Sequence, residues 1–218
     1  MASLAEISAI HIGYALTVFG ACYALGCITL GYYLVWMTTG QDVRQSGSGN
    51  VGARNVSRTL GPWAFAVTLA WDMGKGGLAV WGTERVNSGE SLKCLAMLAV
   101  VAGHIWPAQL RFRGGKGMAT AAGAAIALNP WAMVGPVALF IPLVGLLKST
   151  TLAGLVAFTS LPFVSGFLRN SGWETLGFAL LAALVLFAHR TNIREELAAL
   201  AAARKNRTGS SRSQETPL

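Results

Sequence analysis

Residues 7–41 read ISAIHIGYALTVFGACYALGCITLGYYLVWMTTGQ, and these 35 positions contain no Asp, Glu, Lys or Arg. A helix that crosses a bilayer needs roughly 20 apolar residues, each rising about 1.5 Å. The stretch is therefore long enough to cross a membrane. It is not a cleavable signal peptide, because no Lys or Arg precedes it and because it is too long. The sequence thus predicts a transmembrane segment here.

The rest of the chain has a similar composition. Hydrophobic residues make up 53% of the 218 residues and charged residues only 12%, against about 25% in a typical soluble domain. Further apolar runs occupy 94–110, 117–147, 149–168 and 175–188. A soluble all-helical domain is the alternative, and this composition disfavours it. We therefore predict an all-α, multi-pass membrane helical bundle.

The distribution of charge predicts the number of crossings. The run 117–147 exceeds one span and is too short for two full ones, and Asn129-Pro130 is expected to interrupt it, because proline lacks the N–H of a continuous helix. With two short crossings in this run, thirteen basic residues lie on one side of the membrane and three on the other; with one crossing the count is seven against nine. The positive-inside rule favours the first arrangement, which has about seven transmembrane helices, the N-terminus outside and the C-terminus in the cytoplasm.

On this topology, residues 1–195 form a single membrane-embedded domain. Residues 196–218 begin as an Ala/Glu/Leu helix former and end in a strongly basic segment. That end predicts a disordered cytoplasmic tail attracted to anionic headgroups. A nucleic-acid role would use the same charges, but a membrane surface disfavours it.

The first polar cluster is the glycine-rich loop Gly47–Arg58, with the sequence GSGNVGARNVSR. Its start matches the G-x-G-x-x-G dinucleotide pattern, but the strand and the βαβ unit that this motif requires are missing. Glycine permits positive φ and close approach of the backbone to an anion. A flexible connector is the alternative, and it does not explain the asparagines and the arginine. We predict phosphate contacts from Gly47, Ser48, Gly49, Asn50, Gly52, Asn55 and Arg58.

The second cluster combines His104 with the sequence GGKG at 114–117. Free N–H groups at the start of the following helix and the lysine charge favour an anion, whereas the spacing of a Walker A motif is absent. His104 is expected to cap or pack rather than to catalyse. Asp72 and Lys75, three positions apart in an apolar segment, are expected to form a structural ion pair rather than to contact substrate, because either charge alone would be costly in lipid.

The third cluster, His189–Arg194, lies at the cytoplasmic end of the last predicted helix. Positive charge is favourable at a helix C-terminus and on the cytoplasmic side, which explains Arg190 and Arg194. His189 and Asn192 are three positions apart and share a helix face, which that explanation does not predict. On the topology chosen by charge, all three clusters face the same side of the membrane. Together they could hold two phosphate groups.

In order and in spacing, these clusters resemble the three motifs of the PlsY family of bacterial membrane acyltransferases. The resemblance implies transfer of a fatty acyl group from acyl phosphate to the sn-1 hydroxyl of glycerol 3-phosphate, giving lysophosphatidic acid and phosphate. It also implies a bacterial inner membrane location with the active site facing the cytoplasm. Membrane lipids and the two substrates are the expected partners; no cofactor, metal or nucleic acid is expected, and the oligomeric state stays open. The matching residues are Ser48, Asn50, Asn55, Arg58, Gly114, Gly115, Lys116, Gly117, His189 and Asn192.

Three departures from the family pattern are visible. Arg54 stands where the family usually has threonine, and it adds a cation to the site or its rim. Cys27 replaces a serine that is common after the Leu-Gly of the first helix. Beyond Arg194, the usual Arg-Leu and the later Gly-x-Glu are not evident.

The chemistry expected of such a site is direct attack by the glycerol hydroxyl on the acyl carbonyl. No His-x-x-x-x-Asp pair, common in acyltransferases that use thioester donors, is present. Lys116, Arg58 and glycine N–H groups would hold the phosphates, and Ser48 would donate to a phosphate or to the carbonyl oxygen. His189 is the side-chain candidate for the base, and the acceptor's own phosphate, with a second pKa of about 6, is the alternative. A transporter of a phosphorylated or anionic metabolite is the other function considered, which helices broken at mid-membrane and repeat symmetry would favour.

Overall fold

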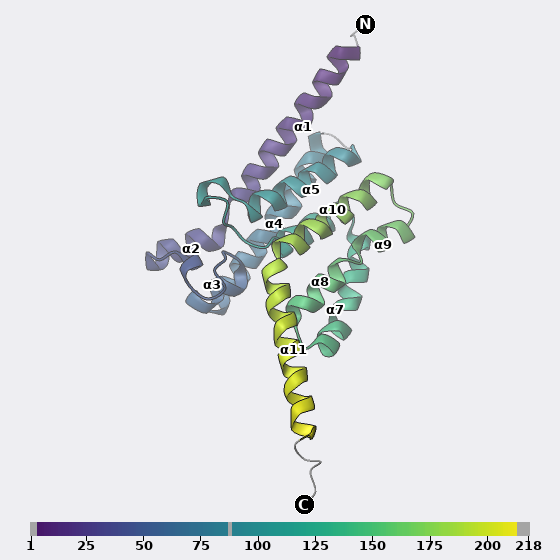
Figure 1. The fold of residues 1–218 in the computed structure, drawn as a ribbon. Coiled ribbons are helices and arrows are strands. Elements are labelled where there is room, and N and C mark those ends of the chain that lie inside the picture. The colour runs from purple at the N-terminus through teal and green to yellow at the C-terminus, as the bar shows by residue number, and fades with distance from the viewer. Residues whose placement is uncertain (1–3, 87–88, 213–218) are drawn as a thin grey trace, which may run out of the picture.

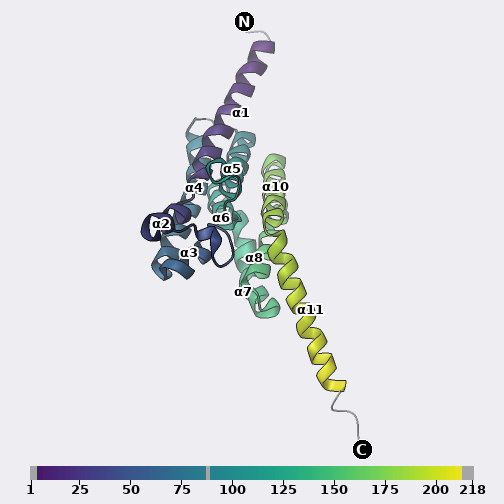
Figure 2. The same ribbon diagram turned by 60° about the vertical axis from the view of Figure 1, so that its left-hand side comes forward.

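The computed structural model describes residues 4–86 and 89–212. All regular elements in these ranges are helices, as predicted (Figure 1). Helices α1 (Leu4–Cys27) and α11 (Arg190–Arg212) project from opposite ends of the molecule in both views (Figures 1 and 2). The helices between them are α2 (Leu30–Thr39), α3 (Ala53–Leu60), α4 (Pro62–Val86), α5 (Glu90–Ile105), α6 (Met118–Leu128), α7 (Val134–Leu147), α8 (Thr150–Phe158), α9 (Leu161–Phe167) and α10 (Gly172–Ala188). Short 3₁₀ turns cover Val43–Gln45, Ala108–Leu110 and Pro130–Met133.

Fewer segments qualify as membrane spans than the seven helices predicted. By length and composition, four segments of the described chain qualify, and α10 with the start of α11 adds a fifth if this pair, bent by 61°, is one span. Helix α6, with 11 residues, is too short to cross alone. Helix α4 is long enough, at 25 residues, but carries four charged residues. The four segments are His11–Thr39, Glu90–Leu110, Pro130–Leu147 and Thr150–Phe167.

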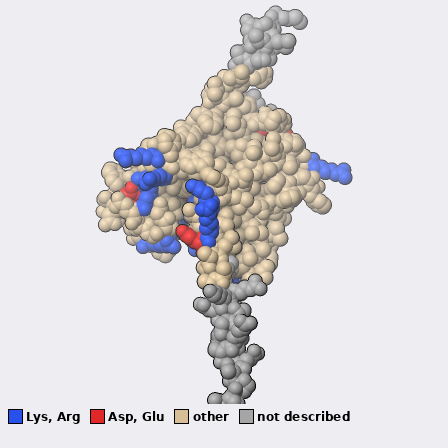
Figure 3. Space-filling view, viewed as in Figure 1, with Lys and Arg blue, Asp and Glu red and all other residues tan. Residues whose placement is uncertain are grey.

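The outer surface has the character expected of a lipid-facing one. Lys and Arg gather mainly over α2 and α3 and at the start of α11, while most of the visible face is uncharged (Figure 3). Large apolar side chains are exposed on several helices, which would be unfavourable in water over so wide an area. The most exposed of them on α7 and α9 are Ile141, Leu146, Phe163 and Phe167.

The apolar run at 7–41 is not one helix, because it breaks between α1 and α2. Side chains of α4 satisfy carbonyl groups that the break leaves free. Lys75 Nζ donates to Gly26 O and Ile28 O at 3.2 and 3.1 Å, and Trp71 Nε1 donates to Ile28 O at 2.8 Å. An unpaired backbone group in lipid costs several kcal/mol, so these contacts stabilise the break.

The ion pair expected between Asp72 and Lys75 is present. Lys75 Nζ lies 2.9 Å from Asp72 Oδ1, and both side chains are almost completely buried. His104 Nδ1 lies 2.9 Å from Lys75 Nζ and 3.3 Å from Asp72 Oδ1. The three side chains connect α4 with α5 and, through Lys75, with the break after α1. These contacts agree with a structural role for the pair.

Replacement of Lys75 by methionine should strongly lower the thermal stability of the detergent-solubilised protein. Breaking a buried ion pair leaves one charge uncompensated, and we expect a loss of about 3–5 kcal/mol. Thermal unfolding followed by circular dichroism measures this. The double variant Asp72→Asn/Lys75→Met should regain part of the loss, because no buried charge is left unpaired. Equal melting temperatures for Lys75→Met and the parent protein would contradict the assigned role.

Small residues allow the helices to pack closely, as is common between membrane helices. A Cβ at Gly103 of α5 would collide with the carbonyl oxygen of Tyr23 in α1. A Cβ at Gly76 of α4 would collide with the carbonyl oxygen of Thr120 in α6. Helix α1 therefore lies directly against α5, and α4 directly against α6.

Helix α6 ends at Leu128, so the interruption predicted at Asn129-Pro130 is confirmed. Asn129 Oδ1 accepts the N–H of Trp131 at 3.0 Å, and Asn129 Nδ2 donates to Glu174 Oε1 of α10 at 2.8 Å. One side chain thus both caps the next turn and connects it to α10.

Helix α11 continues to Arg212, beyond the point where the sequence indicated a disordered tail. The run LAALAAA at 197–203 continues the helix as expected of strong helix formers, and the basic segment 204–212, expected to be disordered, is helical as well. Residues 213–218 of the predicted tail lie outside the described residues. The division of the chain at residue 195 stays a prediction.

Candidate active site

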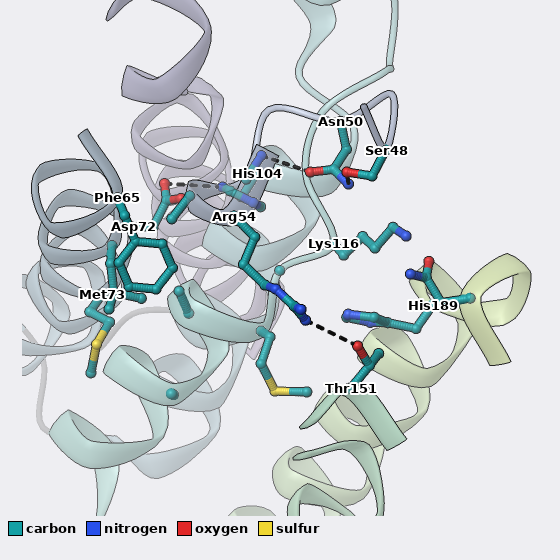
Figure 4. Close-up of a pocket in the computed structure, with 18 of the residues that line it drawn as sticks. Ser48, Asn50, Arg54, Phe65, Asp72, Met73, His104, Lys116, Thr151 and His189 are labelled. Atoms are coloured by element: carbon teal, nitrogen blue, oxygen red, sulfur yellow. Dashed lines mark hydrogen bonds and ion pairs between the residues drawn. The ribbon is translucent and has the colours of Figure 1, made fainter. Parts of the chain in front are cut away.

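A cavity of about 720 Å³ lies where the three polar clusters meet (Figure 4). Part of its lining comes from the loop before α3, the loop before α6 and the junction of α10 with α11, which are far apart in the chain. The predicted site residues that line it are Ser48, Asn50, Gly52, Arg58, Asp72, His104, Lys116, Gly117, His189 and Asn192. The predicted residues that are not part of its lining are Gly47, Gly49, Asn55, Lys75, Gly114 and Gly115.

Asn55 organises the first loop from a buried position. Its Oδ1 accepts the N–H of Ser48 at 2.9 Å. Its Nδ2 donates to the carbonyl oxygens of Val43, Ser46 and Asn50 at 2.9, 3.0 and 2.9 Å. The loop therefore folds around the side-chain amide of Asn55. This amide holds in place Ser48 and Asn50, which line the cavity.

The glycines of the first loop serve its backbone conformation. Gly47 and Gly49 have φ of 58° and 68°, in the left-handed region that a Cβ disfavours. A Cβ at Gly47 would also collide with Asn55 Oδ1. Ser48 lies between the two glycines, and Asn50 Nδ2 donates to its hydroxyl at 3.0 Å. The hydroxyl is thereby held at the edge of the cavity.

Replacement of Asn55 by alanine should destabilise the protein. Backbone groups of the loop lose their partners, and each unsatisfied buried group costs about 1–3 kcal/mol, so we expect a loss of about 2–4 kcal/mol. The melting temperature in detergent measures it. Asn55→Asp keeps the acceptor for Ser48 but removes the donors, so it should recover only a small part. A melting temperature for Asn55→Ala equal to that of the parent would show that the loop does not depend on this amide.

The second loop presents Lys116 and a helix N-terminus to the cavity. Gly117 is the N-cap of α6 with φ of 81°, and no side chain caps the first N–H groups of this helix. Such N–H groups and the positive end of the helix dipole favour an anion. Burial lowers the pKa of Lys116, while the Glu195 carboxylate opposes that shift. A bound anion would further stabilise the charged lysine.

His104 fixes the same loop through its backbone and its ring. Gly115 N donates to His104 O, and Gly114 N donates to Ile105 O, both at 3.0 Å. A Cβ at Gly115 would collide with His104 Nε2. His104 is only 3% exposed, and its Nδ1 lies against Lys75. These contacts agree with the packing role expected from the sequence.

His189 is oriented by the backbone of its own helix. It directly follows α10, and its Nδ1 lies 2.8 Å from the carbonyl oxygen of Val185. Because a carbonyl can only accept, Nδ1 carries a proton, and Nε2 of the neutral ring is an acceptor. Figure 4 shows the ring directed into the cavity between Lys116 and Thr151. One turn later, Asn192 Oδ1 is buried with no hydrogen-bond partner in the described chain, which leaves it available to a ligand.

Arg44, which no sequence motif singled out, joins the loop before α3 to the loop before α6. Its Nη1 donates to Leu110 O at 2.8 Å, and its Nη2 lies 2.7 Å from Asp42 Oδ2. The hydrogen bonds from Arg44 hold the pKa of Asp42 below its usual value. Arg44 thus acts as a brace beside the site.

One side of the cavity is apolar, which the motifs did not indicate. Three of its side chains lie four positions apart on α4, a spacing that places them on one helix face and could have identified them. The others come from separate helices and have no local signal. The lining residues that the sequence did not single out include Phe65, Leu69, Met73, Phe140, Thr151 and Glu196. Fold and site together define a multi-pass membrane protein with a cationic cavity that is apolar on one side.

Comparison with known proteins identifies the family. The family model of glycerol-3-phosphate acyltransferase matches residues 16–199. The chain is 41% identical over 175 residues to glycerol-3-phosphate acyltransferase 1 of Desulfitobacterium hafniense (strain Y51), covering 80% of this chain and 87% of that protein. It is 42% identical over 168 residues to glycerol-3-phosphate acyltransferase 1 of Moorella thermoacetica, covering 77% and 85%. The chain therefore belongs to the glycerol-3-phosphate acyltransferase family of enzymes, as its motifs indicated.

Solved structures agree with this assignment. The fold matches the crystal structure of the glycerol 3-phosphate form of PlsY, an integral membrane glycerol 3-phosphate acyltransferase, with a TM-score of 0.78 and 29% identity over 85% of this chain and 92% of that chain. The lysophosphatidic acid form matches with a TM-score of 0.74 and 28% identity, with the same coverage. The protein is thus an integral membrane enzyme with multiple helical spans.

Proposed function

We propose that this protein transfers a fatty acyl group from acyl phosphate to the sn-1 hydroxyl of glycerol 3-phosphate, releasing lysophosphatidic acid and inorganic phosphate. The observation that carries the proposal is one cavity in which Lys116, Arg58 and the start of α6 share the lining with an apolar wall. The acceptor and the product are supported by the related PlsY structures, which are its glycerol 3-phosphate and lysophosphatidic acid forms.

The two halves of the cavity suit the two parts of an acyl phosphate, the phosphate group and the hydrocarbon chain. The polar half offers two cations, the α6 N-terminus and the Ser48 hydroxyl to phosphate oxygens. The apolar half, formed chiefly by α4 with Phe140 of α7, suits a hydrocarbon chain. An acyl phosphate bound across both would present its carbonyl carbon near the boundary, beside His189.

The reaction is a direct displacement. The glycerol hydroxyl oxygen attacks the acyl carbonyl carbon, and the new ester C–O bond replaces the C–O bond to phosphate. His189 Nε2 takes the hydroxyl proton and passes it to the departing phosphate. Lys116 and Arg58 stabilise the negative charge on that phosphate. Because phosphate is a good leaving group, no covalent intermediate on the protein is needed.

We further propose seven crossings, with the N-terminus outside and the site facing the cytoplasm of a bacterial inner membrane. The charge asymmetry of the loops supports this arrangement. Helix α4 would add one crossing to the segments that qualify by hydropathy, and α6, which is shorter than a full span, would make one of the two short crossings expected in residues 117–147.

The test is phosphate release by the purified protein given acyl phosphate and glycerol 3-phosphate. Release should require both substrates and yield lysophosphatidic acid. In sealed inside-out vesicles, externally added glycerol 3-phosphate should be used, whereas right-side-out vesicles should be inactive. If the protein transfers no acyl group from acyl phosphate, acyl-CoA or acyl carrier protein, the proposed acyltransferase activity is refuted. Uptake of glycerol 3-phosphate into liposomes without turnover would favour the transporter instead.

A further inference from the structure

Arg54, near the start of α3, extends across the cavity to the start of α8 (Figure 4). Its Nη1 donates to Thr150 Oγ1 at 3.4 Å and to Thr151 Oγ1 at 3.3 Å. Both distances are longer than is usual for an N–H···O bond. Within the described chain, no carboxylate forms an ion pair with Arg54. The guanidinium is therefore held in the site by two weak contacts with neutral hydroxyls.

Among the residues that the structure describes, these contacts leave most of the N–H donors and the charge of the guanidinium unpaired. Arginine carries five N–H donors in a rigid fork and stays charged, whereas a hydroxyl is a neutral acceptor. A hydrogen bond to an ionised phosphate is roughly twice as strong as one between neutral groups. A phosphate that enters the cavity would therefore draw Arg54 away from Thr150 and Thr151.

The position of Arg54 distinguishes between the two phosphates. In Figure 4 its side chain lies between Phe65 on the apolar side and Lys116 on the polar side. An acyl donor must place its chain along the apolar wall, so its phosphate lies at this boundary. Glycerol 3-phosphate has no chain and fits within the polar half. The donor phosphate is thus the one within reach of Arg54.

We propose that Arg54 binds the phosphate of the acyl donor and that Thr150 and Thr151 hold the guanidinium in place while the site is empty. The proposal rests on the proposed function. The family that the chain resembles usually has threonine here, so this contact would give the protein a donor-binding cation that its relatives generally lack.

Steady-state kinetics of Arg54→Thr test the proposal. The KM for acyl phosphate should rise about 10-fold to 100-fold, as expected for loss of a charge-assisted hydrogen bond. The kcat should change by less than about threefold, and the KM for glycerol 3-phosphate by less than about twofold. Arg54→Lys keeps the positive charge but loses the planar guanidinium, so its KM for acyl phosphate should lie between those of the parent and of Arg54→Thr. Arg113→Thr is the matched control: Arg113 is exposed and does not line the cavity, so both KM values should stay unchanged.

Each other outcome overturns the proposal in a recognisable way. If the parent protein turns over normally and Arg54→Thr has an unchanged KM for acyl phosphate, Arg54 does not bind the donor phosphate. The proposed function then stands. A rise only in the KM for glycerol 3-phosphate shows that Arg54 serves the acceptor. A parent protein that does not turn over acyl phosphate refutes the proposed function and this proposal with it.

Discussion

Replacement of Lys116 by alanine is expected to reduce kcat for acyl transfer by about 10²–10³-fold, the size of effect seen when one stabilising donor is removed from an active site. Lys116 lies beside the uncapped N-terminus of α6 and faces the cavity in a half-buried position. A partly desolvated charge interacts more strongly with a departing phosphate than a charge in water does. Initial rates of phosphate release at saturating concentrations of both substrates measure the loss.

Controls separate this effect from a loss of fold. Lys116→Arg keeps the positive charge and should retain more activity than Lys116→Ala. Lys93→Ala removes a lysine that pairs with Glu84 at 3.5 Å and does not line the cavity, so it should be fully active. Melting temperatures of all three variants should stay close to that of the parent. A kcat for Lys116→Ala within about twofold of the parent would remove Lys116 from the mechanism.

Replacement of His189 by alanine is expected to lower kcat by about 10²–10⁴-fold, the range of general base catalysis. The reason is the proton arrangement of the ring: Nδ1 donates to Val185 O, so Nε2 is free to accept the proton of the glycerol hydroxyl. The kcat–pH profile of the variant should also lose the limb that reports the imidazole. Stopped assays of lysophosphatidic acid over a range of pH provide both quantities.

The informative second variant is His189→Asn. Its side-chain N–H can replace Nδ1 as donor to Val185 O, but it offers no basic nitrogen at the position of Nε2. It should therefore fold like the parent and be as slow as His189→Ala. If both variants keep measurable turnover with the parental pH profile, the acceptor phosphate is the base, and His189 only shapes the site.

Much of the site could be predicted from the sequence. The glycine loop, the GGKG sequence and the pair His189 and Asn192 lie within single local segments, so their composition indicates anion binding without knowledge of the fold. The ion pair of Asp72 and Lys75 was predictable for a similar reason, since the two charges share a helix face and would be costly apart.

Other assignments depended on contacts between distant segments. Asn55 was expected to contact phosphate, but its amide is occupied by the backbone of its own loop. The apolar wall combines residues of α4 with Phe140 of α7, and no local pattern connects them. The break between α1 and α2 depends on donors from α4, so the uninterrupted hydropathy of residues 7–41 conceals it.

The sequence by itself determined that this chain is helical and lies in a membrane, and it predicted three segments suited to binding phosphate. These are consequences of local properties: the length of apolar runs, the freedom of glycine and the sign of charges near helix ends. Only the tertiary structure decided which nitrogen of His189 is free, which way Asn55 turns and where Arg54 reaches. Each of these depends on a hydrogen-bond partner or a packing neighbour, and the folded helices alone bring those partners within contact distance.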